Sequence, residues 1–261
     1  MPLSVNASKY IRWGLDIVLG LILLLELLVP NASPLLYPAL VSLAALSSMA
    51  ALTRSLPAQS VVIVAIITAL IGGLAHYLSA KFSLPFGPIL FKPFLSHAGL
   101  GFMPFTMPLL WIVVVFNGRG TMRLALRPWR KTKRYGWWLL GLTGIVAVLF
   151  DFALEPFATR VKHLWSWQPT KLPIDWQGAS PLNFVGWFFV TLLILAFTTP
   201  WLVKKNPDRV KGPVYQPLIL LLGALLLFAM GCARMGLWLP VSVDVAIAAV
   251  ILISAVRGAT W

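Results

Sequence analysis

The sequence predicts an all-α membrane protein, a bundle of about eight transmembrane helices that forms a single domain over residues 1–261. Two observations carry this prediction. Hydrophobic residues make up 59% of the chain and charged residues only 11%, whereas roughly 25% of the residues in soluble domains are charged. In addition, the apolar residues gather in stretches of about 20, the length that an α-helix needs to cross a bilayer.

Eight stretches satisfy that length rule, and they define the expected spans: residues 11–29, 35–53, 60–80, 98–116, 136–155, 184–203, 215–233 and 238–256. The fourth span is the weakest because Gly99, Gly101, Pro104 and Pro108 interrupt its first half. A membrane tolerates such interruptions only where protein or a cavity covers the freed backbone groups. The fourth span must therefore be covered by protein or line a cavity.

The basic residues predict the orientation. With a cytoplasmic N-terminus, 15 of the 21 Lys and Arg residues fall on the inner side of the membrane and six on the outer side. This excess favours an even number of spans, with the N- and C-termini both cytoplasmic. We expect a multi-pass protein of a bacterial or archaeal plasma membrane. The net charge of +14 fits cytoplasmic loops beside anionic lipid better than nucleic acid, for which we find no motif.

The longest basic segment has cations at helical spacing. Arg119, Arg123, Arg127 and Arg134 recur at this spacing, together with Arg130 or Lys131. The pattern predicts a short amphipathic helix on the cytoplasmic surface, with its arginines toward phosphate headgroups.

Five of the seven carboxylates lie inside apolar stretches, where an ionisable group is costly and is therefore a candidate functional group. The alternative is that an acid near the end of a span reaches the interface or caps a helix, which applies most to Asp16 and Asp244. The topology places most of these groups in the outer half of the membrane. It predicts one polar site there, built on Asp151 and Glu155 and supported by Glu26, His76 and Asp244.

Asp151 and Glu155 are four residues apart, so they share one face of a helix. Two acids this close in a low dielectric should not both be ionised. A protonated carboxyl beside a carboxylate is typical of acid–base catalysis at neutral pH. The alternative is a structural pair that Arg160 or a helix end satisfies.

The segment after this pair is rich in tryptophan and amides. It contains Trp165 and Trp167, then Trp176 and Gln177, then Asn183 and Trp187. Tryptophans alone would be typical of an interfacial belt, but beside amides and buried acids they indicate a pocket wall. Aromatic faces stabilise a cation where water is excluded, so such a pocket could protonate an alkene and hold the carbocation.

The same segment resembles the carotenoid biosynthesis hydratases, which include carotenoid 1,2-hydratases of bacteria and bisanhydrobacterioruberin hydratases of haloarchaea. The matching residues are Asp151, Glu155-Pro156, Trp165 with Trp167, Trp176 with Gly178, and Asn183-Phe184 with Gly186-Trp187. A second block of the family resembles Leu84-Pro85-Phe86-Gly87-Pro88 and Pro104 to Trp111. The chain departs from the family pattern at five positions, with Glu155 for Asp, Trp176, Ile89 and Phe91 for Tyr, and Ser180 for Pro.

The resemblance implies hydration of the terminal alkene of an acyclic carotenoid such as lycopene, giving a tertiary alcohol. We expect Asp151 as proton donor, Glu155 as the carboxylate that orients or deprotonates water, and Asn183 as a hydrogen-bonding positioner. The substrate would contact aromatic side chains, namely Trp165, Trp167, Trp176, Trp187, Phe86 and Trp111. The loss of hydroxyl groups at Ile89, Phe91 and Trp176 leaves the particular carotenoid open.

Hydration needs no redox cofactor, and we expect neither a cofactor nor a metal. The expected partners are the carotenoid, water, membrane lipid and other enzymes of carotenoid biosynthesis. Two alternatives remain open. One is a proton-coupled membrane transporter or carrier of a lipid-like molecule, which would also use buried acids. The other is a non-hydratase paralogue in carotenoid biosynthesis.

Overall fold

The computed structural model describes residues 5–29, 36–92, 103–170, 174–203 and 212–261. This part of the chain contains eight α-helices, each of which overlaps one predicted span: α1 (Val5–Leu28), α2 (Leu36–Leu52), α3 (Ala58–Phe82), α5 (Thr106–Ala125), α6 (Tyr135–Pro156), α7 (Pro181–Leu202), α8 (Gln216–Arg234) and α9 (Trp238–Ala259). Five of them are long and apolar enough to cross a membrane: α3, α6 with the turn that follows it, α7, α8 and α9. The helical class is therefore confirmed, and the apolar helices indicate a membrane protein.

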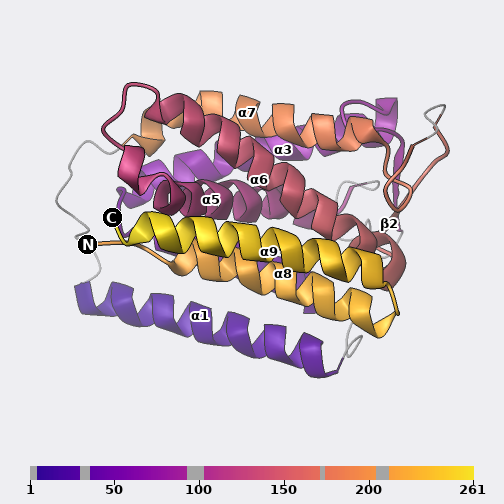
Figure 1. The fold of residues 1–261 in the computed structure, drawn as a ribbon, viewed down its shortest axis with the longest axis horizontal. Coiled ribbons are helices and arrows are strands. Elements are labelled where there is room, and N and C mark those ends of the chain that lie inside the picture. The colour runs from indigo at the N-terminus through magenta and orange to yellow at the C-terminus, as the bar shows by residue number, and fades with distance from the viewer. Residues whose placement is uncertain (1–4, 30–35, 93–102, 171–173, 204–211) are drawn as a thin grey trace.

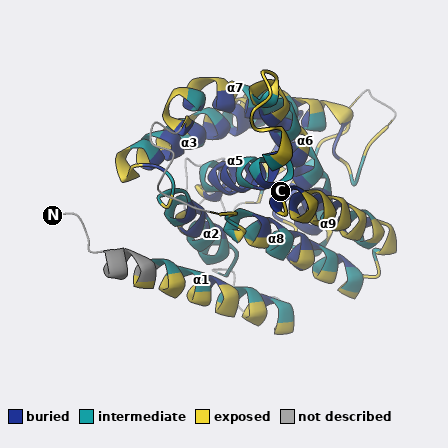
Figure 2. Ribbon diagram, turned by 60° about the vertical axis from the view of Figure 1, so that its left-hand side comes forward, coloured by how far each residue is buried: buried dark blue, intermediate teal, exposed yellow. Residues whose placement is uncertain are grey.

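Helix α5 occupies the centre of the bundle (Figure 1) and contacts α2, α3, α6, α8 and α9. Most of its side chains are buried, as expected for a helix that protein covers on all sides (Figure 2). Helix α1 lies at the edge of the bundle, against α2 and α8, and exposes much of its apolar surface. The start of α1 and the end of α9 lie at the same end of the bundle (Figure 1), as expected for eight helices that alternate in direction.

Two short strands lie at the opposite end of the bundle (Figure 1), which we call the sheet end. Strand β1 (Ile89–Phe91) follows α3, and strand β2 (Trp165–Trp167) follows α6. They pair in antiparallel fashion, with Ile89 opposite Trp167 and Phe91 opposite Trp165. The pair fixes the segment after α3 against the segment after α6.

Helix α6 ends in a π-helical turn over Phe157–Val161, directly after Pro156. The Thr159 hydroxyl donates to the Glu155 carbonyl oxygen at 2.6 Å. Wide turns of this kind occur mostly as single turns inside or at the end of α-helices, often beside functional sites. Here the turn begins two residues after Glu155 and leads the chain toward β2.

The structure corrects two predictions about the middle of the chain. The fourth span was placed at residues 98–116, but α5 runs from Thr106 to Ala125, and residues 93–102 lie outside the described part. The prediction of a separate amphipathic helix on the surface was also wrong. Arg119 and Arg123 belong to α5 itself, and a short 3-10 turn over Arg127–Trp129 follows it.

Two of these arginines bind helix ends instead of pointing only to the surface. Arg119 Nη2 donates to the carbonyl oxygen of Leu202, the last residue of α7, at 3.2 Å. Arg127 Nη1 donates to the carbonyl oxygen of Ala259, the last residue of α9, at 2.9 Å. The last carbonyls of a helix have no partner within the helix and carry partial negative charge, so a guanidinium satisfies them well.

Two glycines permit close packing around the sheet end. A Cβ atom on Gly72 of α3 would lie 2.2 Å from Cγ of Trp111, and one on Gly186 of α7 would lie 2.8 Å from the Pro85 carbonyl oxygen. Cβ atoms do not approach other atoms this closely. Glycine at these positions therefore lets Trp111 and the segment around Phe86 lie directly against the helices.

Candidate active site

Helices α6 and α7 bring together the three polar residues that the sequence indicated. Asn183 Nδ2 donates to Asp151 Oδ2 at 2.5 Å and lies 3.4 Å from Glu155 Oε1. Asp151 is 0% exposed, and Glu155 and Asn183 are each 1% exposed. We call these three residues the carboxylate cluster. The i, i+4 spacing places both acids on the face of α6 that α7 covers.

Strand β2 supplies two further donors to the carboxylate cluster. The indole nitrogens of Trp165 and Trp167 donate to Glu155 Oε2 at 3.3 and 2.9 Å. These two side chains flank Ser166 in an extended strand. The alternative in which Arg160 satisfies the acids is wrong, because Arg160 Nε donates to Gln177 Oε1 at 3.2 Å.

The two acids therefore have unequal surroundings. Glu155 has three nitrogen donors within 3.4 Å, from Trp165, Trp167 and Asn183. Asp151 has one, from Asn183, and its Oδ1 atom is buried with no hydrogen-bond partner among the described residues. Hydrogen bonds from neutral donors stabilise the charged form of a carboxyl group. Glu155 is consequently the better placed of the two to be the carboxylate.

An aromatic box surrounds His76 of α3. The His76 ring centroid lies 4.4 Å from that of Phe86, 5.9 Å from Trp187, 6.0 Å from Trp111 and 6.2 Å from Phe91. Trp111 and Trp187 stack on each other, with centroids 4.2 Å apart. Trp187 lies one helical turn after Asn183 on the same face of α7. The box therefore adjoins the carboxylate cluster along that helix.

Several buried polar atoms around the two groups have no partner among the described residues. They are both ring nitrogens of His76, Nε1 of Trp111, Oγ of Ser180 and Oδ1 of Asp151. Most buried polar atoms in proteins are hydrogen-bonded to protein or ordered water. A region with this many unpaired atoms suits a few water molecules or a polar ligand group.

The positions that depart from the family pattern lie beside the same groups. Ile89 and Phe91 pair with Trp167 and Trp165 in the sheet, and Phe91 also contacts His76. Ser180 is buried directly before α7. Trp176 does not bind the acids, since its indole nitrogen donates to the Phe152 carbonyl oxygen at 2.8 Å and its ring stacks on Phe152.

Two of the three expected outer supports, Glu26 and Asp244, lie apart from the carboxylate cluster. Glu26 of α1 forms an ion pair with Lys162, which follows the π-helical turn. Asp244 of α9 is buried, and neither of its carboxyl oxygens has a partner among the described residues. Of the three expected supports, only His76 adjoins the cluster, through the aromatic box.

Sequence reasoning missed Ser79, which fixes the Phe86 segment. Its hydroxyl donates to the Gly87 carbonyl oxygen at 2.9 Å and accepts from the Phe86 N–H at 3.0 Å. The only signal in the sequence is a serine in the last turns of an apolar helix. Such a residue is equally typical of a helix that bonds its own backbone.

The sequence of this chain matches the family described as carotenoid biosynthesis protein over residues 36–251. The chain belongs to this family. The expected resemblance is thus confirmed at the level of the family, and the match covers the carboxylate cluster, both strands and the aromatic box. It begins at the first residue of α2, so α1 lies outside it. Comparisons with curated proteins and with solved structures gave no match. Within the described residues, no group of three or more His, Cys, Asp and Glu side chains could hold a metal ion.

Proposed function

We propose that this protein hydrates the terminal alkene of an acyclic carotenoid such as lycopene, adding water across the ψ-end double bond to give a tertiary alcohol. Family membership supports the carotenoid class. The observation that supports hydration concerns two buried carboxyl groups on one face of α6. Glu155 accepts hydrogen bonds from more donors than Asp151 does. Acid-catalysed hydration needs one group that gives a proton and another that receives one.

Asp151 is the proposed proton donor. Burial and the neighbouring Glu155 carboxylate favour its neutral form, and only Asn183 opposes this by donating to Oδ2. The unpaired Oδ1 atom would then carry the transferable proton. Transfer of this proton to the less substituted carbon of the alkene breaks the π bond and leaves a tertiary carbocation at the other carbon.

Glu155 is the proposed water-binding carboxylate. Three donors hold its side chain in one orientation. Because the carboxylate is already positioned, it need not reorient during the reaction. Water adds to the tertiary cation through its oxygen and passes a proton to Glu155. Return of that proton to Asp151 restores the starting state, so the net reaction is alkene plus water to alcohol.

The aromatic residues would stabilise the cation and exclude bulk water. Trp165 and Trp167 donate hydrogen bonds to Glu155 through their indole nitrogens, so their side chains lie directly beside the carboxylate cluster. Trp111, Trp187 and Phe86 form the adjoining box. A cation over an aromatic face is stabilised most when it is desolvated. The polyene would enter from the bilayer of the cell membrane, and water from the sheet end.

The origin of the product oxygen tests this proposal. In a lycopene-producing host that expresses the protein, oxygen-18 from labelled water should appear in the product hydroxyl, and hydroxylation should continue without molecular oxygen. Label that arrives from molecular oxygen would instead identify an oxygenase and exclude hydration.

A further inference from the structure

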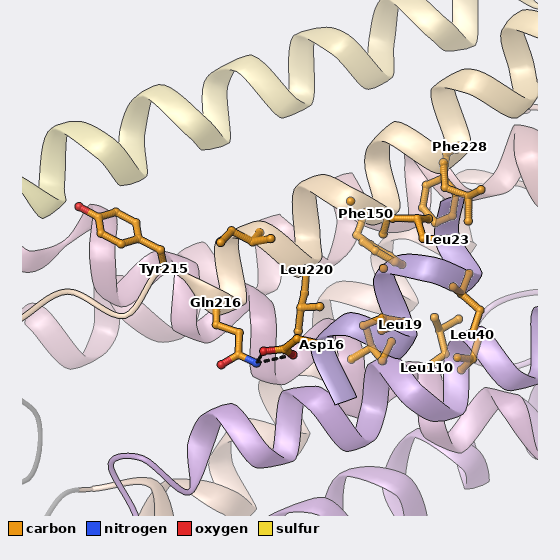
Figure 3. Close-up of a pocket in the computed structure, with 18 of the residues that line it drawn as sticks. Asp16, Leu19, Leu23, Leu40, Leu110, Phe150, Tyr215, Gln216, Leu220 and Phe228 are labelled. Carbon is orange, nitrogen blue, oxygen red and sulfur yellow. Dashed lines mark hydrogen bonds between the residues drawn. The ribbon is translucent and has the colours of Figure 1, made fainter. Parts of the chain in front are cut away.

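A cavity of about 570 Å³ lies between α1, α2, α5, α6 and α8 (Figure 3). Helix α6 contributes Phe150 and Leu154 to its wall, each one residue before an acid of the carboxylate cluster and so on a different face of the helix. Its volume falls within the roughly 300–1,000 Å³ typical of small-molecule sites. The remaining wall is mainly apolar and includes Leu19, Leu23, Leu40, Leu110, Leu227 and Phe228.

One end of this cavity holds a hydrogen-bonded carboxylate. Asp16 Oδ1 accepts from the Ser47 hydroxyl at 2.5 Å and from Gln216 Nε2 at 2.8 Å, and Oδ2 accepts from the same nitrogen at 2.9 Å. Figure 3 shows Asp16 and Gln216 beside Leu220, with most of the other labelled leucine and phenylalanine side chains to the right of this pair. A carboxylate can accept about four hydrogen bonds, so Oδ2 retains capacity for one more donor.

A second polar group lies farther along the same cavity. The Tyr37 hydroxyl is buried and has no hydrogen-bond partner among the described residues. Tyr37 precedes Ser47 by ten positions on α2, which corresponds to about 15 Å along the helix axis. The cavity is therefore elongated, with a polar group toward each end and apolar side chains between them.

The charges around the cavity select the head group of its ligand. Arg54 also lines the cavity. The two charged residues of the lining, Asp16 and the exposed Arg54, carry opposite charges, so the cavity has no net charge that would attract an ionic head group. A neutral hydroxyl group can donate to Asp16 Oδ2 without bringing a further charge into the apolar site.

We propose that this cavity binds a long-chain neutral alcohol, with its hydroxyl group on Asp16 Oδ2 and its hydrocarbon chain along the apolar wall toward Tyr37. Helix α1 would close the site, since it supplies Asp16, Leu19 and Leu23. The site is separate from the carboxylate cluster, and its occupation does not depend on the proposed hydration.

Photolabelling of the purified full-length protein with a photoreactive dodecanol tests this proposal. Unlabelled dodecanol should compete about tenfold better than dodecane, because a hydrogen bond to a charged acceptor contributes at least this much. The labelled peptides should come from α1 and α8. Binding is measured without turnover, so the result is independent of any hydratase activity.

Two variants and one control make the test specific. Asp16→Leu should abolish the preference for the alcohol over the alkane. Gly223→Phe should fill the cavity and reduce labelling about tenfold, since a Cβ at Gly223 meets only Leu23 Cδ2, at 3.5 Å. Gly14→Phe is the control, because Gly14 also lies in open space but does not line the cavity. Equal competition by dodecanol and dodecane, or full labelling of Gly223→Phe, overturns the proposal.

Discussion

Asn183 and Asp151 are joined by a hydrogen bond of 2.5 Å between Nδ2 and Oδ2, and the same nitrogen lies 3.4 Å from Glu155 Oε1. One amide group thus contacts both acids and connects α7 to α6 at the centre of the carboxylate cluster. Asn183 can give each acid a hydrogen atom but cannot accept through this nitrogen. The amide therefore positions the two acids without carrying a proton between them.

Asp151→Asn should nearly abolish formation of hydroxylated carotenoid. The amide keeps the volume of the side chain but cannot protonate an alkene, and general acid–base groups typically contribute about 10²–10⁴-fold in rate. Pigment analysis of a lycopene-producing host, with protein quantified in the membrane fraction, measures the effect. Asp175→Asn is the matched control, because Asp175 lies in an exposed loop where its carboxyl oxygen accepts from Gly178 N–H, as an amide oxygen also can. Normal hydroxylation by a well-expressed Asp151→Asn protein would refute the assigned proton donor.

Trp167→Phe should lower the hydration rate about tenfold or more, and Trp165→Phe should lower it less. Each change removes an indole N–H from Glu155 and keeps an aromatic ring, and the Trp167 hydrogen bond is the shorter by 0.4 Å, from 3.3 to 2.9 Å. Initial rates with purified protein give the comparison. Trp176→Phe is the control and should keep a rate near that of the wild type, because the Trp176 indole nitrogen donates to the Phe152 carbonyl oxygen and not to Glu155. An equal loss of rate in all three variants would contradict a specific role for the hydrogen bonds to Glu155 and would point to the packing of the larger indole rings instead.

Gly72→Ala should destabilise the protein by about 1–3 kcal/mol, the usual cost of overpacking a core. The added methyl group would overlap the Trp111 side chain, whose Cγ lies 2.2 Å from the Cβ position. Gly141→Ala on α6 is the control, since a Cβ there meets nothing within 4 Å. Thermal unfolding in detergent should show a lower Tm for Gly72→Ala only. A Tm for Gly72→Ala equal to that of the control would show that Trp111 can move at little cost.

A reporter fused after Lys133 should be cytoplasmic, and one fused after Gln168 should be external. These residues lie in the connections at opposite ends of α6, which is long and apolar enough to cross a membrane. The predicted topology assigns 15 of the 21 basic residues to the Lys133 side, which the positive-inside rule places in the cytoplasm. Paired phosphatase and fluorescent-protein fusions read out both sides. If both reporters were found in the same compartment, the predicted orientation would be wrong.

The helices could be predicted because their signal is simple. A membrane helix needs about 20 apolar residues, and this length rule located each of the eight described helices. The error at α5 has a physical cause. Its last nine residues include Arg119 and Arg123, which read as a loop by hydropathy, but α7 supplies a carbonyl partner for Arg119 inside the bundle. Hydropathy contains no information on such a distant partner.

The candidate site was predictable in part for similar reasons. The spacing of Asp151 and Glu155 is local, so it implied a shared face without further information. The donors to Glu155 come from β2, whose three residues are too few to show alternation and whose partner strand lies more than 70 positions earlier in the chain. The pairing of Glu26 with Lys162 was likewise hidden, since it depends on where α1 packs.

Arg119 and Arg127, which donate hydrogen bonds to the carbonyl oxygens of Leu202 and Ala259, have two separate roles. In the predicted orientation, the positive charges of Arg119 and Arg127 would favour a cytoplasmic location for this end of the bundle. In the folded bundle each guanidinium group also donates a hydrogen bond to the last carbonyl oxygen of a helix, α7 for Arg119 and α9 for Arg127. Two of the cations on which the predicted orientation depends therefore also connect separate helices in the folded bundle.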